Sequence, residues 1–120
     1  MAVVELTNTA FDTTIQNNAT VIVDFWAPWC GPCRSFAPVF EKVSADYPDV
    51  VFAKVNTENE QAIAAHFQIR SIPTLMIFRD QIMIFSQPGA LPESALRDLL
   101  TQAQALDMDQ VRAEIAKQDQ

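Results

Sequence analysis

Two cysteines separated by two residues, Cys30 and Cys33, are the feature that most constrains what this chain can fold into. They are the only cysteines among 120 residues, and they follow the strand-like run of residues 20–25. A helical pattern begins at Cys33. Two thiols at this spacing can close a small disulfide ring and can open it again. The sequence therefore predicts a redox site where a strand gives way to a helix.

The two cysteines are expected to play different parts. Cys30 lies at or just before the helix N-terminus, where unpaired N–H groups and the helix dipole favour negative charge. Because the thiolate is the attacking species, a lowered thiol pKa makes Cys30 the nucleophile. Cys33 lies in the first turn, where shielding suits it to resolve a mixed disulfide. Gly31 and Pro32 offer no charge that would stabilise the thiolate, so the motif favours a reductant over an oxidant.

Composition predicts one compact domain with few classes of partner. A chain of 120 residues, 49% of them hydrophobic, can bury a core but has no room for a second domain of similar size. Eight basic and fifteen acidic residues give a net charge of -7, which disfavours a phosphate-binding surface. We identify no signal segment at the N-terminus and no apolar run long enough to span a bilayer. We therefore expect a cytoplasmic protein without a nucleic-acid or membrane partner.

Two other uses of the cysteines are less well supported. A structural zinc ion needs about four Cys or His ligands. This chain has three such residues, and His66 is far from the pair in sequence. We therefore expect no metal site and interpret His66 as a solvated side chain. A purely structural disulfide between these cysteines would close a very small loop and stabilise the fold little.

A single acid, Asp24, interrupts the apolar run of residues 21–25. Burial would raise the pKa of this carboxyl, and its place six residues before Cys30 would let it accept a proton from Cys33. The alternative is that Asp24 caps a turn or faces solvent at a sheet edge. Lys54, on the next expected strand, is either the counter-charge of Asp24 or a surface lysine.

The periodicity of apolar residues predicts alternating strands and helices. Strands are expected at residues 3–6, 20–25, 50–55, 75–79 and 82–85, and helices at residues 9–17, 33–47, 58–67 and around 96–106. Val111 and Ile115 predict one further short helix. This order predicts an α/β fold with a parallel core sheet, helices on both faces and an antiparallel hairpin at one edge. We expect residues 1–106 to form the domain and residues 107–120 a helical extension.

Several motifs together resemble the thioredoxin family over about residues 4–106. They are Val23–Ala27 leading into Trp29–Cys33, then Ala37–Pro38, Arg70–Thr74 and Gly89–Ala90. The resemblance implies a thioredoxin fold, with a central mixed sheet of about five strands flanked by helices. It also implies a cis peptide bond between Ile72 and Pro73.

The resemblance further implies how the site would work. Cys30 would attack, Cys33 would resolve, Asp24 would be the buried acid that assists Cys33, and Lys54 would be its neighbour. A flat docking surface for an extended substrate chain would consist of Trp29, Ile72, Pro73, Gly89 and Ala90. No cofactor would be bound, and a flavin-dependent thioredoxin reductase would return electrons from NADPH to the pair. Disulfide-containing proteins would be the substrates of a monomer.

Three residues depart from the family pattern. Arg34 stands where lysine is common, and Gln68 and Gln81 stand where glycine is common. A left-handed backbone at either glutamine would cost about 1 to 2 kcal/mol. None of these departures replaces a redox residue, so they bear on the choice of partner rather than on the redox chemistry.

Two hypotheses for function follow. The first is a general protein-disulfide reductase that acts through a mixed disulfide. The second is a binding module that regulates a partner through the same flat surface, with redox activity incidental. An oxidant or isomerase is less consistent with Gly31 and Pro32.

Overall fold

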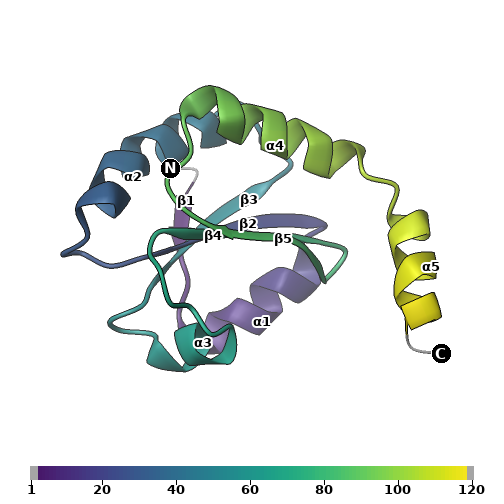
Figure 1. Ribbon diagram of the computed structural model, residues 1–120, viewed down its shortest axis with the longest axis horizontal. Helices are drawn as coiled ribbons and strands as arrows, with labels where there is room; N and C mark the ends of the chain where they lie inside the picture. Colours follow the sequence, from purple (N-terminus) through teal and green to yellow (C-terminus); the bar gives the residue numbers. More distant parts are fainter. Residues whose placement is uncertain (1–2, 119–120) are drawn as a thin grey trace.

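A central five-stranded sheet carries helices on both of its faces (Figure 1). The computed structural model describes residues 3–118. In chain order its elements are β1 (Val3–Glu5), α1 (Asn8–Asn17), β2 (Thr20–Trp26), α2 (Gly31–Ser44), β3 (Val51–Asn56), α3 (Gln61–His66), β4 (Thr74–Arg79), β5 (Ile82–Pro88), α4 (Glu93–Ala105) and α5 (Met108–Gln118). The first two residues of the expected domain and the last two of the expected extension lie outside the described residues.

The central strand β2 is buried because it has neighbours on every side. Along β2, Val21, Val23 and Phe25 pack into one core cluster together with residues of α1 and α3. Ile22, on the opposite face, packs into a second cluster with residues of α2 and α4. Since both faces of the sheet are covered, the strand needs apolar residues at nearly every position, as its sequence has.

The strand order is β1-β3-β2-β4-β5. β1 and β2 both pair with β3 in parallel, whereas β4 pairs antiparallel with both β2 and β5. The expected mixed sheet of five strands is confirmed. The expectation that only the last hairpin is antiparallel is wrong, since β4 also runs against β2.

Helix length explains the direction of β4. The 14 residues of α2 rise by about 21 Å, enough to return the chain to the end of the sheet where β2 began. The 6 residues of α3 rise by only about 9 Å, roughly half the length of a six-residue strand. The chain therefore enters β4 at the end of the sheet where β3 finished, and β4 runs antiparallel.

Three helices differ from the expected ranges by two residues or more, and one of them is α4, which begins at Glu93 rather than near residue 96. α2 begins at Gly31, two residues before the expected start, and ends at Ser44 rather than at residue 47. α3 begins three residues later than expected because Asn56 holds the preceding segment in a turn. The Asn56 side chain accepts the N–H of Glu58 at 3.0 Å, and its carbonyl accepts the N–H of Glu60 at 2.9 Å.

Among residues 3–118, three residues other than glycine have left-handed backbone: Gln68 (φ 55°), Asp80 (φ 50°) and Gln81 (φ 72°). Gln68 ends α3 in a Schellman motif, in which the N–H of Ile69 donates to the Ala64 carbonyl at 2.9 Å. Asp80 and Gln81 form the two-residue turn between β4 and β5, where both positions need positive φ. The left-handed backbone considered for the two glutamines is thus present.

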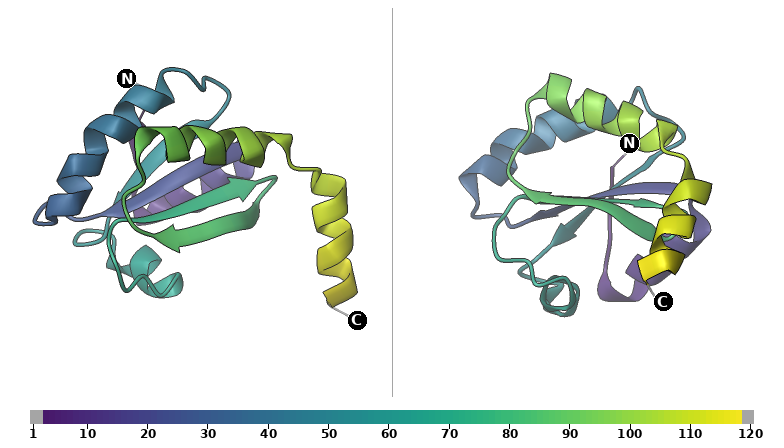
Figure 2. Two further views of the ribbon diagram at one scale, coloured as in Figure 1. Left: turned by 45° about the horizontal axis from the view of Figure 1, so that its top comes forward. Right: turned by 45° about the vertical axis from the view of Figure 1, so that its right-hand side comes forward.

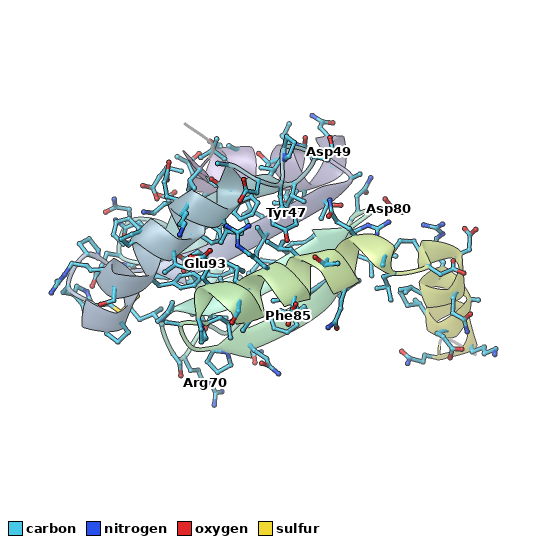
Figure 3. All side chains as sticks on the ribbon, turned by 90° about the horizontal axis from the view of Figure 1, so that it is seen from above. Tyr47, Asp49, Arg70, Asp80, Phe85 and Glu93 are labelled. Carbon is cyan, nitrogen blue, oxygen red and sulfur yellow. A yellow bond between two sulfur atoms is a disulfide. The ribbon has the colours of Figure 1, made fainter. Side chains whose placement is uncertain are left out.

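α5 follows α4 at the end of the sheet that carries the β4–β5 turn, and it projects beyond that end (Figure 2). Two arginines connect this region to the sheet. Arg79 Nη1 donates to the carbonyl oxygens of Ala103 at 2.6 Å, Gln104 at 3.2 Å and Leu106 at 3.3 Å. Arg112 of α5 donates to Asp80 at 3.2 Å, close to the end of α4 in Figure 3. Arg79 therefore places a positive charge on the C-terminal carbonyls of α4, where the helix dipole favours it.

Replacing Arg79 with methionine should lower the free energy of unfolding by about 1 to 2 kcal/mol, because three carbonyls lose a charged donor. Urea unfolding followed by circular dichroism would measure the loss. Arg79→Lys is the matched control, since it keeps the charge and should retain part of the stability. A methionine variant as stable as the wild type would contradict this role for Arg79.

Candidate active site

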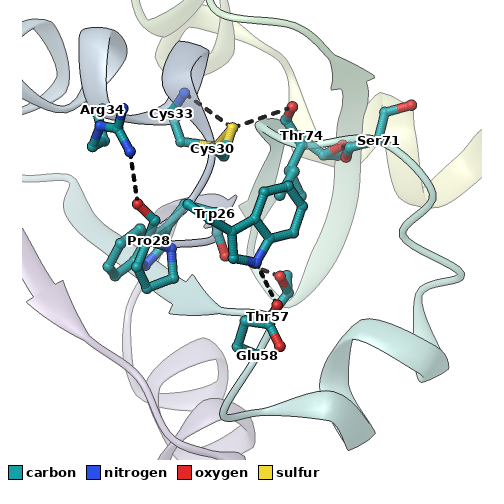
Figure 4. The surroundings of a disulfide bond; sticks show 11 residues. Trp26, Pro28, Cys30, Cys33, Arg34, Thr57, Glu58, Ser71 and Thr74 are labelled. Carbon is teal, nitrogen blue, oxygen red and sulfur yellow. Dashed lines mark hydrogen bonds between the residues drawn. A yellow bond between two sulfur atoms is a disulfide. The ribbon is translucent and has the colours of Figure 1, made fainter.

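The cysteine pair lies where β2 connects to α2 (Figure 4). Cys30 is the N-cap of α2, and its Sγ accepts the backbone N–H of Cys33 at 3.2 Å. Gly31 and Pro32 are the first two residues of the helix, where the missing N–H of proline costs nothing. The two cysteines form a disulfide. An N–H donor and a helix N-terminus both favour negative charge on Cys30 Sγ once the disulfide is reduced.

Both cysteines are largely covered, with 5% of Cys30 and 2% of Cys33 exposed. Cys33 is less exposed than Cys30, as expected for the resolving cysteine. The difference is small, because Ile72 and Trp26 also pack against the pair.

The loop before β4 faces the disulfide. The Ile72 carbonyl oxygen lies 3.7 Å from Cys30 Sγ, and the bond between Ile72 and Pro73 is cis. Gly89, at φ 112°, donates its N–H to the Pro73 carbonyl at 2.8 Å. Three of the five residues expected to form the docking surface are therefore connected to one another and to Cys30. Ala90 is exposed and follows Gly89 directly.

Trp29 is the most prominent apolar side chain next to the pair, with 65% of its surface exposed. Its indole N–H donates to the Glu58 carboxylate. Glu58 is not among the site residues predicted from the sequence, although the sequence contains a signal for it. Because β2 and β3 are parallel, their carboxyl ends meet, so the residues after β3 lie beside the segment after β2.

Arg34 turns back toward the same segment. Its Nη1 donates to the Pro28 carbonyl at 3.1 Å, as Figure 4 shows. A planar guanidinium can make this contact while it keeps further donors free.

Asp24 is a buried acid, with only 2% of its surface exposed. It is the direct cross-strand partner of Lys54 on β3. Burial raises the pKa of Asp24 to about 7, the charge of Lys54 acts to lower it, and the charge of Glu5 acts to raise it. The alternatives of a turn cap or a solvent-facing edge position are wrong, because β2 is the central strand.

Lys54 does not form a close ion pair with Asp24. Instead its Nζ lies 4.2 Å from the centroid of the Trp26 ring, a cation–π contact. Within the described residues, Asp24 Oδ1 has no hydrogen-bond partner. Lys54 thus acts on Asp24 through its charge rather than through a hydrogen bond.

Within residues 3–118, no three His, Cys, Asp or Glu side chains are grouped so that they could hold a metal ion. His66 is exposed and lies edge-on to Phe67. None of the helices in this range has the length and apolar character needed to cross a bilayer.

The thioredoxin family model matches residues 2–102. The chain belongs to the thioredoxin family. Similar sequences include "Putative thioredoxin 2" of Streptomyces coelicolor, 56% identical over 115 residues that cover 96% of this chain and 86% of the relative. Thioredoxin of Pyropia yezoensis is 44% identical over 102 residues, which are 83% of this chain and 95% of the relative.

Solved structures of the family agree with this fold. A structure of Plasmodium falciparum thioredoxin matches with a TM-score of 0.77 and 35% identity, covering 82% of this chain and 96% of that one. Members of the thioredoxin family are thiol–disulfide oxidoreductases that need no bound cofactor. With its two cysteines in place, this chain is a disulfide reductase of that family.

The buried carboxyl predicts an unusual dependence of stability on pH. Native Asp24 keeps its proton up to about pH 7, whereas an unfolded aspartate releases it near 3.8. The native state therefore binds more protons between these values, and the contribution of Asp24 to stability falls as the pH rises through this range. The difference corresponds to roughly 4 kcal/mol at most.

Asp24→Asn removes the ionisation and keeps the size of the side chain. The variant should match the wild type near pH 4 and become more stable than it as the pH rises to 8, by up to about 4 kcal/mol. Urea unfolding of the oxidised protein at a series of pH values would measure the difference. Parallel profiles of the two proteins would show that Asp24 does not titrate near neutrality.

Proposed function

We propose that this protein is a general protein-disulfide reductase in which Cys30 attacks, Cys33 resolves and Asp24 exchanges the proton of Cys33. The observation that carries the proposal is the position of Cys30. It caps a helix N-terminus, accepts the N–H of Cys33 and lies against the Ile72 carbonyl at the edge of an exposed apolar surface.

In the first step, the Cys30 thiolate attacks one sulfur of a substrate disulfide. A bond forms between Cys30 Sγ and that sulfur, and the second substrate sulfur leaves as a thiolate and takes up a proton. The helix N-terminus supports this step because it stabilises the thiolate before the attack.

In the second step, Cys33 loses its proton and attacks Cys30 Sγ. The intramolecular disulfide forms and the first substrate sulfur leaves, so the substrate gains two electrons and two protons in all. The bonded pair in this structure supports the step, since the two sulfurs are within reach of each other. A carboxyl with a pKa of about 7 suits Asp24 to accept and release a proton near neutrality.

An extended segment of the substrate would dock on the surface around Cys30. Trp29 offers an exposed apolar ring beside the pair, and Ile72, directly before Pro73, offers main-chain groups next to Cys30. Gly89 and Ala90 extend this surface, and both are exposed. Recognition through main-chain groups would suit a protein that acts on many substrates.

The proposal also covers how the cysteine pair is reduced again and in which compartment of the cell the protein acts. A flavin-dependent thioredoxin reductase would reduce the pair with electrons from NADPH, in the cytoplasm, where disulfides are kept reduced. The uncharged residues Gly31 and Pro32 support this direction, because they leave the dithiol a good donor. We also propose that the protein acts as a monomer. Residues 1–106 would form the redox domain and residues 107–120 an extension outside the reaction.

Replacing Cys33 with serine should stop the reaction after the first step, because no thiol remains to resolve the intermediate. The variant should accumulate mixed disulfides with cell proteins through Cys30, visible on non-reducing gels and by mass spectrometry. The double variant Cys30→Ser, Cys33→Ser is the control and should trap none. If Cys33→Ser yields no adducts beyond this control, the proposed order of attack is wrong.

A turnover assay can combine NADPH, a thioredoxin reductase and insulin as the protein disulfide. It tests the electron donor, the direction of electron transfer and catalysis together. The wild type should consume NADPH in proportion to the disulfides reduced, and Asp24→Asn should slow the resolving step by about 10-fold or more at pH 7. No consumption of NADPH with a wild-type protein shown to be folded would contradict the reductase function.

A further inference from the structure

Three ionisable side chains lie in one row across three neighbouring strands. Glu5 of β1 is the cross-strand partner of Lys54 on β3, and Lys54 is the partner of Asp24 on β2. These strands are adjacent at one side of the sheet (Figure 1). Because both pairings are parallel, partners at the same register position point to the same face of the sheet. Lys54 therefore lies between two carboxyl side chains, one exposed and one buried.

The residues two positions earlier on the same three strands show on which face of the sheet the charged row lies. They are Val3, Phe52 and Ile22, which pack together in the core cluster beneath α2 and α4. Side chains alternate between faces along a strand, so the charged row continues on this same face. The charged row thus lies on the side of the sheet that carries α2 and its two cysteines.

Glu5 also holds the side chain that contacts Lys54. Its Oε2 accepts the indole N–H of Trp26 at 3.1 Å. The Trp26 ring in turn lies 4.2 Å from Lys54 Nζ and packs against the cysteine pair. Trp26 follows Asp24 by two positions on β2, so it points to the same face. A hydrogen bond and a cation–π contact thus connect Glu5, Trp26 and Lys54 on the solvent side of Asp24. We call these three residues the Glu5 clasp.

Few other charges face Asp24. From β4, its cross-strand neighbour is the apolar residue Leu75. The charged residues of α2, Arg34, Glu41 and Lys42, are all exposed, and none of them acts on the pKa of Asp24. Cys30 and Cys33 do not titrate while they form a disulfide. The remaining charges that act on Asp24 are those of Lys54 and Glu5.

We propose that Glu5 is a positioning residue of the redox site, which holds Trp26 against Lys54 and offsets the Lys54 charge, and so sets the pH range in which Asp24 exchanges its proton. The inference rests on the proposed part of Asp24 in the reaction. It adds a residue outside the cysteine motif that would tune the resolving step.

The sign of the effect follows from the charges. Lys54 favours the ionised form of Asp24, and the negative charge of Glu5 opposes it. Without the Glu5 charge, Lys54 would act unopposed and Asp24 would lose its proton at lower pH. Neighbouring strands lie about 4.8 Å apart, so these carboxyls, two strands apart, are roughly 10 Å from each other. At that distance Coulomb's law gives a change of about 0.3 to 1 pH unit.

The test is a titration of the Asp24 carboxyl by carbon-13 NMR in the oxidised protein, where the cysteines are silent. Glu5→Gln removes the charge and keeps an oxygen that can accept the indole N–H. It should move the midpoint of Asp24 to lower pH by about 0.3 to 1 unit, and 0.5 M salt should reduce the change. Lys54→Met should move the midpoint the other way. Glu41→Gln, an exposed glutamate on α2, makes the same change in net charge and should leave it unaltered.

A separate variant tests whether Glu5 holds the Trp26 ring in place. Glu5→Leu removes the acceptor as well as the charge, so the Trp26 indole N–H should exchange with solvent at least 10-fold faster than in Glu5→Gln. The pH profile of the resolving step, followed from a preformed mixed disulfide, should shift to lower pH in Glu5→Gln along with the titration.

The outcomes separate the two proposals. An Asp24 midpoint in Glu5→Gln equal to that in Glu41→Gln, or equal indole exchange in Glu5→Leu and Glu5→Gln, would overturn the role of Glu5. A second outcome is that the Asp24 midpoint moves in Glu5→Gln while Asp24→Asn resolves mixed disulfides at the wild-type rate. This outcome would support the electrostatic role of Glu5 and overturn the proposed part of Asp24 in the reaction.

Discussion

The burial of β2 on both faces, with a strand paired along each edge, is the constraint on which the rest of the structure depends. β2 fixes where the chain leaves the sheet after Trp26, and therefore where α2 begins. Its parallel partner β3 ends at the same edge, which brings Glu58 to Trp29. The helix N-terminus, the exposed indole and the cysteines thus meet because one strand is held rigidly in the core.

The same burial gives Asp24 its unusual chemistry and has a cost in stability. An ionised carboxyl in the centre of a sheet is unfavourable, and only the charge of Lys54 offsets this in part. Asparagine would be the more stable choice at neutral pH. A residue that destabilises the fold and yet titrates near pH 7 is typical of a site that moves protons. Glu5 and Trp26 join this site through contacts that span three strands.

Much of this arrangement could be predicted from the sequence. The order of elements followed from apolar periodicity, and the position of Cys30 at the helix start followed from the strand that precedes it. Burial of Asp24 followed from its apolar neighbours. The direction of β4 could not be predicted from the pattern, because it depends on how far the short helix α3 carries the chain. The contacts of Glu5 and Glu58 depend on strand register, which a local pattern does not contain.

Gln68 shows that the fold tolerates local backbone strain at the end of α3. A side chain at φ 55° costs free energy that glycine at the end of a helix would not. One kilocalorie per mole corresponds to a few degrees, about 4 °C, in the melting temperature of a domain this size. Relief of this strain at the helix end would therefore raise the melting temperature without replacing a residue of the redox site.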